Sequence, residues 1–158
     1  MTGDKPETAK SIAISTKLIR TDYVGLEFIE DKTNFGAAYK KLSEFLDELV
    51  ANRASNLLED SSNKKYYLII NGSVLNTVFN NELLSDLLYD AVSRCICAVF
   101  CRVSPKQKSQ VVELIKAKEP LTTVLCIGDG ANDVPMIMEA HIGVGISGKE
   151  GTQVLLIY

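Results

Sequence analysis

The stretch that decides the fold is Thr123–Pro135, which reads TVLCIGDGANDVP. An apolar run ends at Gly128, and two aspartates and an asparagine follow it closely. This pattern predicts a strand whose carboxyl end lies at the ligand edge of a parallel sheet. Asp129 would sit at that edge, and Gly128 and Gly130 would allow a close backbone approach or a positive φ. The alternative is that these glycine, aspartate and asparagine residues only build a turn and a helix cap.

The rest of the chain alternates strands with helices, which predicts βαβ units and a mostly parallel sheet covered by helices on both faces. The predicted fold class is therefore α/β and Rossmann-like. We expect Asp4 to cap the first helix with Glu7 in a capping box, and residues 54–65 to form a surface connection. The predicted strands are 24–29, 66–70, 98–101, 124–127 and 142–146, and the predicted helices are 5–18, 35–50, 80–93, 104–118 and 132–140.

The bulk composition narrows the class of protein. The 158 residues carry a net charge of −3 and are 46% hydrophobic, so nothing favours a nucleic-acid partner. No run approaches the roughly 20 apolar residues of a membrane helix, and the first residues do not resemble a signal peptide, so the chain itself is expected to be soluble and cytosolic. The four cysteines Cys95, Cys97, Cys101 and Cys126 are spaced unlike a metal site, and we expect buried thiols.

A second segment of interest, RVSPKQK at Arg102–Lys108, leaves a strand and enters a helix. Ser104 is suited to the N-cap, and Gln107 would complete a capping box. Lys106 and Lys108 would then lie in the first turn, where the helix dipole disfavours a cation. Cations at such a place suggest an anion held by the lysine and the helix together, and the alternative is that they are solvated surface lysines.

Carboxylates near that lysine suggest a divalent cation. Mg²⁺ prefers one or two carboxylates together with waters and phosphate oxygens. Asp129 supplies one carboxylate, and Asp133 could hold a coordinated water or orient the loop. His141, the only histidine, is predicted to be a packing or surface residue. DKTN at 31–34 is predicted to be a plain turn and helix cap, and the ligand edge is expected to collect residues 2–4, 71–73, 102–108, 128–133 and 147–151.

Together these segments resemble the phosphorylation domain of P-type ATPases, which has the haloacid-dehalogenase fold, and within them the phospholipid-flippase subfamily. TGDKPETA at 2–9 is similar to the family's TGD motif, and CRVSPKQKSQVVELIK at 101–116 to the flippase lysine motif. GDGANDVPMIMEAHIGVGISGKEGTQ at 128–153 resembles the flippase hinge segment, and YLIINGSVL at 67–75 matches more loosely. The three stronger motifs in this order make the resemblance specific.

The resemblance implies roles for individual residues. Asp129 would ligate Mg²⁺ at the transferred phosphoryl group, with Asn132 and Asp133 supporting the phosphate and the metal. Lys108 would neutralise phosphoryl oxygens. The nucleotide or other phosphates would be bound by Thr2, Gly3, Asp4 and Arg102, together with Lys108 and Asn132. ATP would be the substrate of the parent protein and Mg²⁺ its cofactor.

The chain departs from the family in having no DKTGT nucleophile motif. The first hypothesis is a partial phosphorylation domain spanning residues 1–158, without the nucleotide-binding, actuator and membrane parts and without the central strands before Thr2. It would be inactive alone, would come from a membrane-embedded, lipid-translocating parent, and could self-associate through open sheet edges. The alternatives are a soluble haloacid-dehalogenase phosphatase and a non-catalytic module that binds phosphate and Mg²⁺, including a flippase-like region fused to a guanylyl cyclase.

Overall fold

The structure is a computed structural model that describes residues 1–30, 32–58 and 64–146, with side chains described except at 55–58. The chain divides into two compact units, Met1–Val103 and Ser104–Tyr158. The described strands form two parallel sheets, so the expectation of α/β structure with parallel strands is confirmed. Strands β1, β2 and β3 form one of these sheets, and β4 and β5 form the other.

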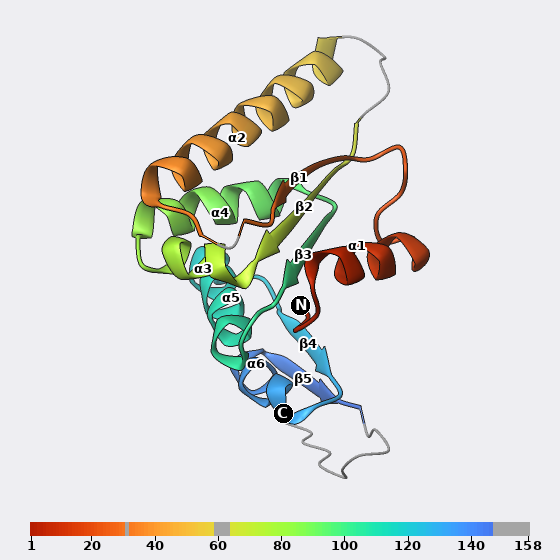
Figure 1. Cartoon of the computed structure of the whole chain (residues 1–158), viewed down its shortest axis with the longest axis vertical. Helices are drawn as coiled ribbons and strands as arrows, with labels where there is room; N and C mark the ends of the chain where they lie inside the picture. Colours follow the sequence, from red (N-terminus) through yellow and green to blue (C-terminus); the bar gives the residue numbers. More distant parts are fainter. Residues whose placement is uncertain (31, 59–63, 147–158) are drawn as a thin grey trace. The chain divides into compact units, whose positions relative to one another are not determined.

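The first unit is built on a three-stranded sheet in the order β1-β2-β3, formed by Val24–Phe28, Tyr66–Asn71 and Cys97–Cys101. The central strand β2 is buried on both faces, as its unbroken apolar sequence YYLII predicts. Alternate residues pack in opposite directions. Tyr67 and Ile69 join Ala9 and Ala13 of α1 (Pro6–Ser15) in one apolar cluster. Figure 1 shows α1 on one face of this sheet and α2 and α4 on the other.

The helices of the first unit differ from expectation in three places. Helix α2 is Phe35–Leu58, longer than predicted, so the surface connection does not begin at residue 54. A helix that the sequence analysis missed, α3 (Gly72–Phe79), starts directly after β2 because Val74, Leu75 and Val78 bury one face of it. The N-cap of α1 is Lys5 and not Asp4, since Pro6 takes the first helical position. Helix α4 is Glu82–Arg94 and is capped by Asn81.

The second unit contains α5 (Pro105–Lys118), β4 (Leu125–Gly128), a 3-10 turn η1 (Ala131–Asp133), α6 (Val134–Glu139) and β5 (Ile142–Gly145). Strands β4 and β5 pair in parallel, with Cys126 opposite Gly143. Cys126 packs with Val112 of α5 and with Met136 and Ile137 of α6. The predicted helix 132–140 is therefore a 3-10 turn followed by a short α-helix. The lysine of α5 and the loop after β4 are consequently held in one unit.

The cysteines are thiols that pack in the interior or near it. Cys97, Cys101 and Cys126 are buried and Cys95 is half-buried, and the described residues form no cluster of three or more potential metal ligands. Asn34 caps α2 by accepting from Ala37 N at 2.9 Å, as the turn-and-cap reading of DKTN requires, whereas Asp31 lies outside the described residues. Within the described ranges, no helix is both long and apolar enough to cross a membrane.

Candidate functional site

The lysine of α5 is placed by a local cap. Ser104 accepts a hydrogen bond from Gln107 N at 3.2 Å, and the Gln107 side chain accepts one from Ser104 N at 2.9 Å. This is the predicted capping box, and it begins α5 at Pro105. The two lysines of the first turn then diverge, because Lys106 is exposed and Lys108 is buried. The surface reading therefore holds for Lys106 and fails for Lys108.

The buried lysine forms an ion pair with an aspartate 25 residues away. Lys108 Nζ donates to Asp133 Oδ1 at 2.7 Å, and both side chains are almost entirely removed from solvent. Asp133 Oδ2 accepts from Asp129 N at 3.3 Å. Burial by itself would raise the pKa of Asp133, but the hydrogen bond and charge of Lys108, with the backbone N–H groups of Asp129 and Gly130, outweigh burial and lower the pKa. Asp133 is therefore an ionised carboxylate that holds the loop around it.

The loop depends on glycine at one position and not at the other. A Cβ on Gly128 would lie 2.3 Å from Asp133 Cβ, so this residue provides the close approach that the sequence suggested. A Cβ on Gly130 would have no atom nearer than 4.0 Å. None of the described glycines has a positive φ, so a positive φ at Gly128 or Gly130, which the sequence also allowed, is wrong. Gly128 is required because the Asp133 carboxylate folds back over the end of β4.

Asp129 and Asn132 occupy a different environment from the ion pair. Both are exposed, and neither side chain has a hydrogen-bond partner within the described residues. The carboxylate of Asp129 is thus available to a cation, whereas both oxygens of Asp133 are already engaged. This donor set fits Mg²⁺, which needs one or two carboxylates and takes its remaining ligands from water and phosphate. The geometry favours Asp129 as a direct ligand and Asp133 as the residue that orients the loop.

The predicted phosphate-binding residues at the start of the chain lie in the first unit. Thr2 N donates to Phe100 O at 2.9 Å and Arg102 N to Asp4 O at 3.0 Å, so residues 2–4 run beside the end of β3. The Thr2 hydroxyl donates to Asp4 Oδ2 at 2.8 Å and accepts from Asp4 N. Arg102 has φ of 50°, which is unusual for a residue with a side chain. The structure therefore brings Thr2, Gly3, Asp4 and Arg102 together as one local group.

Other expected ligand-edge residues are structural. The buried Asn71 donates from Nδ2 to Ile29 O at 3.2 Å, and Ser73 donates to Glu30 O at 2.8 Å. Both residues tie the end of β2 to the segment after β1. The exposed His141 accepts from Val124 N through Nδ1 at 3.0 Å, in agreement with its predicted surface role. The segment 147–151 lies outside the described residues.

The sequence analysis missed an ion pair that supports the site. Lys116 Nζ donates to Glu139 Oε1 at 2.8 Å and to Glu139 O at 2.6 Å. This pair joins the last turn of α5 to the end of α6, and thereby fixes the two helices between which Lys108 and Asp133 meet. The available signal was weak, since a lysine in the last turn of a helix also interacts favourably with the helix dipole and needs no other partner.

Comparison with known proteins identifies relatives along nearly the whole chain. No family model matches. Phospholipid-transporting ATPase ID of Homo sapiens is 38% identical over 172 residues, which cover 99% of this chain and 14% of that protein. Phospholipid-transporting ATPase tat-1 of Caenorhabditis elegans is 42% identical over 97% of this chain, and phospholipid-transporting ATPase IG of Homo sapiens is 34% identical over 97%. The chain spans only 12–15% of the length of these relatives.

Proposed function

The chain belongs to the phospholipid-transporting ATPases, of which it spans a short segment, and we propose that it supplies the metal and lysine half of a phosphoryl-transfer site. The observation that carries the proposal is the buried Lys108–Asp133 pair, whose aspartate accepts from the backbone N–H of Asp129, a residue that is itself exposed. A buried cation and an exposed carboxylate held in one loop-and-helix unit are suited to a phosphate with its divalent cation. The haloacid-dehalogenase fold is the corresponding proposal for the parent domain.

Each residue of the second unit has a proposed part in this chemistry. Mg²⁺, when bound, would supply positive charge to the oxygens of the transferred phosphoryl group. The Asp129 carboxylate would bind the cation, and the Asn132 amide would donate to a phosphoryl oxygen. Asp133 would keep the Lys108 ammonium oriented through the 2.7 Å hydrogen bond. Two further N–H groups of that ammonium would remain to donate to phosphate oxygens.

Residues of the first unit are proposed to bind nucleotide phosphates. Residues 2–4 form a short segment whose backbone is fixed beside β3, and Arg102, directly after β3, donates its backbone N–H to Asp4 O. The left-handed backbone of Arg102 supports this assignment, because such conformations concentrate at ligand-binding positions. In the parent protein the nucleotide would be ATP.

The whole-protein activity that we propose is ATP-driven phospholipid translocation through an aspartyl-phosphate. The 158 residues contain no DKTGT, so the aspartate nucleophile would have to be supplied outside them. This segment would then be a cytosolic part of a membrane protein. The polypeptide of 158 residues by itself should neither form an aspartyl-phosphate nor hydrolyse ATP. Self-association through unpaired strand edges also remains a prediction, which light scattering during gel filtration would test.

The metal site can be tested directly with Mn²⁺ as a paramagnetic substitute for Mg²⁺. Added Mn²⁺ should broaden the amide NMR signals of residues 128–133 selectively, and excess Mg²⁺ should reverse the broadening. Asp129→Asn should abolish the effect, whereas Glu113→Asn, which changes an exposed carboxylate of α5, should leave it intact. Equal broadening of these signals in the unmodified 158-residue chain and in Asp129→Asn would refute the metal assignment.

The missing nucleophile is tested by chemistry. Incubation with radiolabelled ATP and Mg²⁺ should yield no acid-stable phosphoprotein, and a labelled polypeptide would contradict the proposal. Turnover of p-nitrophenyl phosphate that disappears in Asp129→Ala would instead support the soluble phosphatase. Mn²⁺ binding without any turnover, in a chain shown to be complete by its transcript, would support the non-catalytic module.

A further inference from the structure

A cavity whose lining is rich in cations lies in the first unit. It has a volume of about 380 Å³ and is formed by the second half of α2, the start of β2 and the last turn of α4. Three cations line it, namely Arg53 of α2, Lys64 just before β2 and Arg94 of α4, and no carboxylate is among the described lining residues. The cavity lies at the amino end of β2. Because the six residues of this strand rise about 3.3 Å each, the carboxyl end of β2 lies about 20 Å from the cavity.

The three cations have no ion-pair partner in the described part of the chain. In a protein whose acidic residues outnumber its basic ones, 20 to 17, these three cations lie together around one cavity. Lys10, Lys41, Lys108 and Lys116 each contact a carboxylate. Three like charges around one cavity repel one another, and an anion that bound there would remove that repulsion. The charge distribution therefore favours an anionic ligand.

The rest of the lining restricts the kind of anion. Leu49 and the ring of Tyr66 give the cavity an apolar side, and Tyr66 directs its hydroxyl to Glu48 Oε1 at 3.4 Å and not to a ligand. Asn52 Nδ2 donates to Lys64 O at 3.4 Å, which joins α2 to the start of β2. Two guanidinium groups and an ammonium can supply the several N–H donors that a phosphate dianion accepts. The volume exceeds that of a phosphate ion alone and leaves room for an organic group.

We propose that this cavity, lined by Arg53, Lys64 and Arg94, binds a small organic phosphate monoester. The phosphate would lie among the three cations, and the organic group would contact Leu49 and Tyr66. The site is separate from the Lys108–Asp133 region and does not depend on the proposed function. Because the cations are solvent-exposed, binding should weaken as salt screens them.

The test is a titration of the 158-residue chain with phenyl phosphate, followed by amide NMR at low salt. We expect saturable shifts at residues 52–53, 64–66 and 93–94, with a dissociation constant of about 1 mM or below. Inorganic phosphate should bind the same residues roughly threefold to tenfold more weakly, because it lacks the organic group. Benzoate, which has the ring but only one negative charge, should be weaker still.

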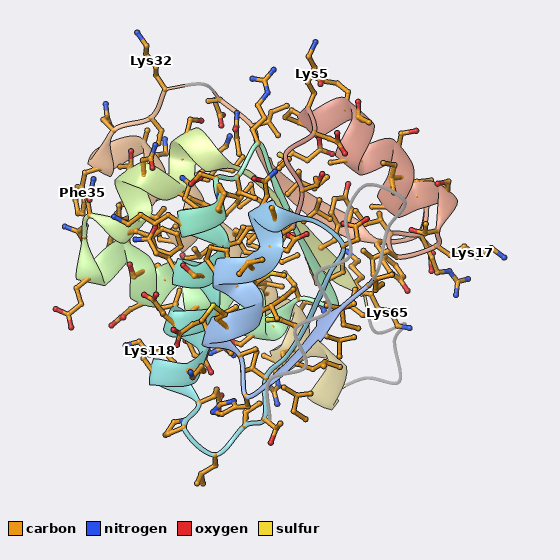
Figure 2. All side chains as sticks on the ribbon, turned by 90° about the horizontal axis from the view of Figure 1, so that it is seen from below. Lys5, Lys17, Lys32, Phe35, Lys65 and Lys118 are labelled. Carbon is orange, nitrogen blue, oxygen red and sulfur yellow. The ribbon has the colours of Figure 1, made fainter. Side chains whose placement is uncertain are left out.

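Variants separate the site from general electrostatic attraction. Arg53→Gln/Arg94→Gln should weaken binding at least tenfold, and Arg53→Lys/Arg94→Lys should restore part of it. The charge-matched control is Lys5→Gln/Lys32→Gln, which removes two exposed cations that extend away from the molecule in Figure 2 and should change the affinity less than twofold. Phenyl phosphate binding is observed at residues 52–53, 64–66 and 93–94, and Mn²⁺ binding at residues 128–133, so failure of this proposal is distinguishable from failure of the proposed function.

Several outcomes would overturn the proposal. Absence of saturable shifts at about 10 mM phenyl phosphate would do so, as would an equal loss of affinity in the Lys5/Lys32 control. Glu59 and Asp60 lie outside the described residues. Binding that appears only in Glu59→Gln/Asp60→Asn would assign the cavity to the chain's own carboxylates and not to a phosphate monoester.

Discussion

Removal of the buried ammonium in Lys108→Met should destabilise the second unit severely. Methionine retains most of the length and apolar surface of lysine, so the change isolates the charge. At 2.7 Å and an effective dielectric constant of about 20, the attraction between Lys108 and Asp133 is about 6 kcal/mol before desolvation is counted. Loss of one partner of a buried pair typically costs about 3–5 kcal/mol, because the other charge stays buried without compensation.

We expect a value near the lower limit, about 3 kcal/mol, because Asp133 would keep its hydrogen bond from Asp129 N. The matched control is Lys106→Met, which removes an exposed lysine from the same helical turn. Because a cation near a helix N-terminus is unfavourable, this control should be neutral or stabilising by about 0.5 kcal/mol. The contrast between the two variants measures burial and pairing, and not the loss of a lysine as such.

Amide hydrogen exchange of α5 and α6 gives the local free energy of opening and should be the primary assay. Five of the six tyrosines lie in the first unit, so tyrosine fluorescence during urea unfolding measures mainly that unit. Asp133→Asn in combination with Lys108→Met should cost less than the sum of the two single changes, with a coupling of about 2 kcal/mol. A cost below about 1 kcal/mol for Lys108→Met, or an equal cost for Lys106→Met, would refute the reasoning.

Four other predictions follow from the same structure. Gly128→Ala should destabilise the second unit by about 3 kcal/mol, because the added methyl group displaces Asp133. Gly130→Ala should change the stability of the same unit by less than about 0.5 kcal/mol. Hydrogen exchange of α6 would measure both effects. The pKa of Asp133 is lowered on folding, so its contribution to stability is complete above about pH 4 and is lost as the pH falls through the lowered value. Circular dichroism between pH 5 and pH 2 should show that loss of stability. Identical pH profiles for the unmodified chain and Asp133→Asn would contradict the prediction. Lys17, just after α1, has a φ of 60°, a conformation that favours glycine. In urea titrations, the free energy of unfolding of Lys17→Gly should exceed that of Lys17→Ala by about 0.5–1 kcal/mol. Equal unfolding midpoints would argue against backbone strain at this position. Burial, with a smaller effect of the neighbouring Cys97, raises the pKa of Cys95 to about 12. Alkylation of Cys95 by iodoacetamide at pH 8 should therefore be more than about 100-fold slower than alkylation of free cysteine, whereas all four thiols should react in urea. Fast labelling of Cys95 in the folded chain would refute this prediction.

The helices that the sequence predicted well are those with local signals. Helix α5 begins where Ser104, Pro105 and Gln107 require it to, because capping involves residues only three positions apart. Local signals failed where another local interaction was stronger. Asp4 is suited to an N-cap, but its carboxylate accepts from the Thr2 hydroxyl, and Lys5 takes the cap position. Such competition within a few residues is difficult to resolve from residue preferences alone.

Other differences came from packing over long distances. Gly72 and Ser73 indicate a loop, yet α3 begins at Gly72 because the residues after it bury their apolar side chains. Asn71 and Ser73 were predicted at the ligand edge but are hydrogen-bonded to the backbone after β1. Their partners lie more than 40 residues away, so no nearby pattern could have separated the structural role from the functional one.

The sequence by itself determined the order of strands and helices and identified the lysine and aspartate segments of the candidate site, because periodicity, caps and motifs are properties of neighbouring residues. Tertiary structure decided which charges meet. It buried Lys108 against Asp133 and left Lys106 in solvent, although both lysines lie in one helical turn. It also left Asp129 exposed and placed Asp133 so close to Gly128 that a Cβ at this position would clash. These outcomes depend on the packing of α5 against α6 and on the fold of the loop after β4, and therefore on distances that the linear sequence does not contain.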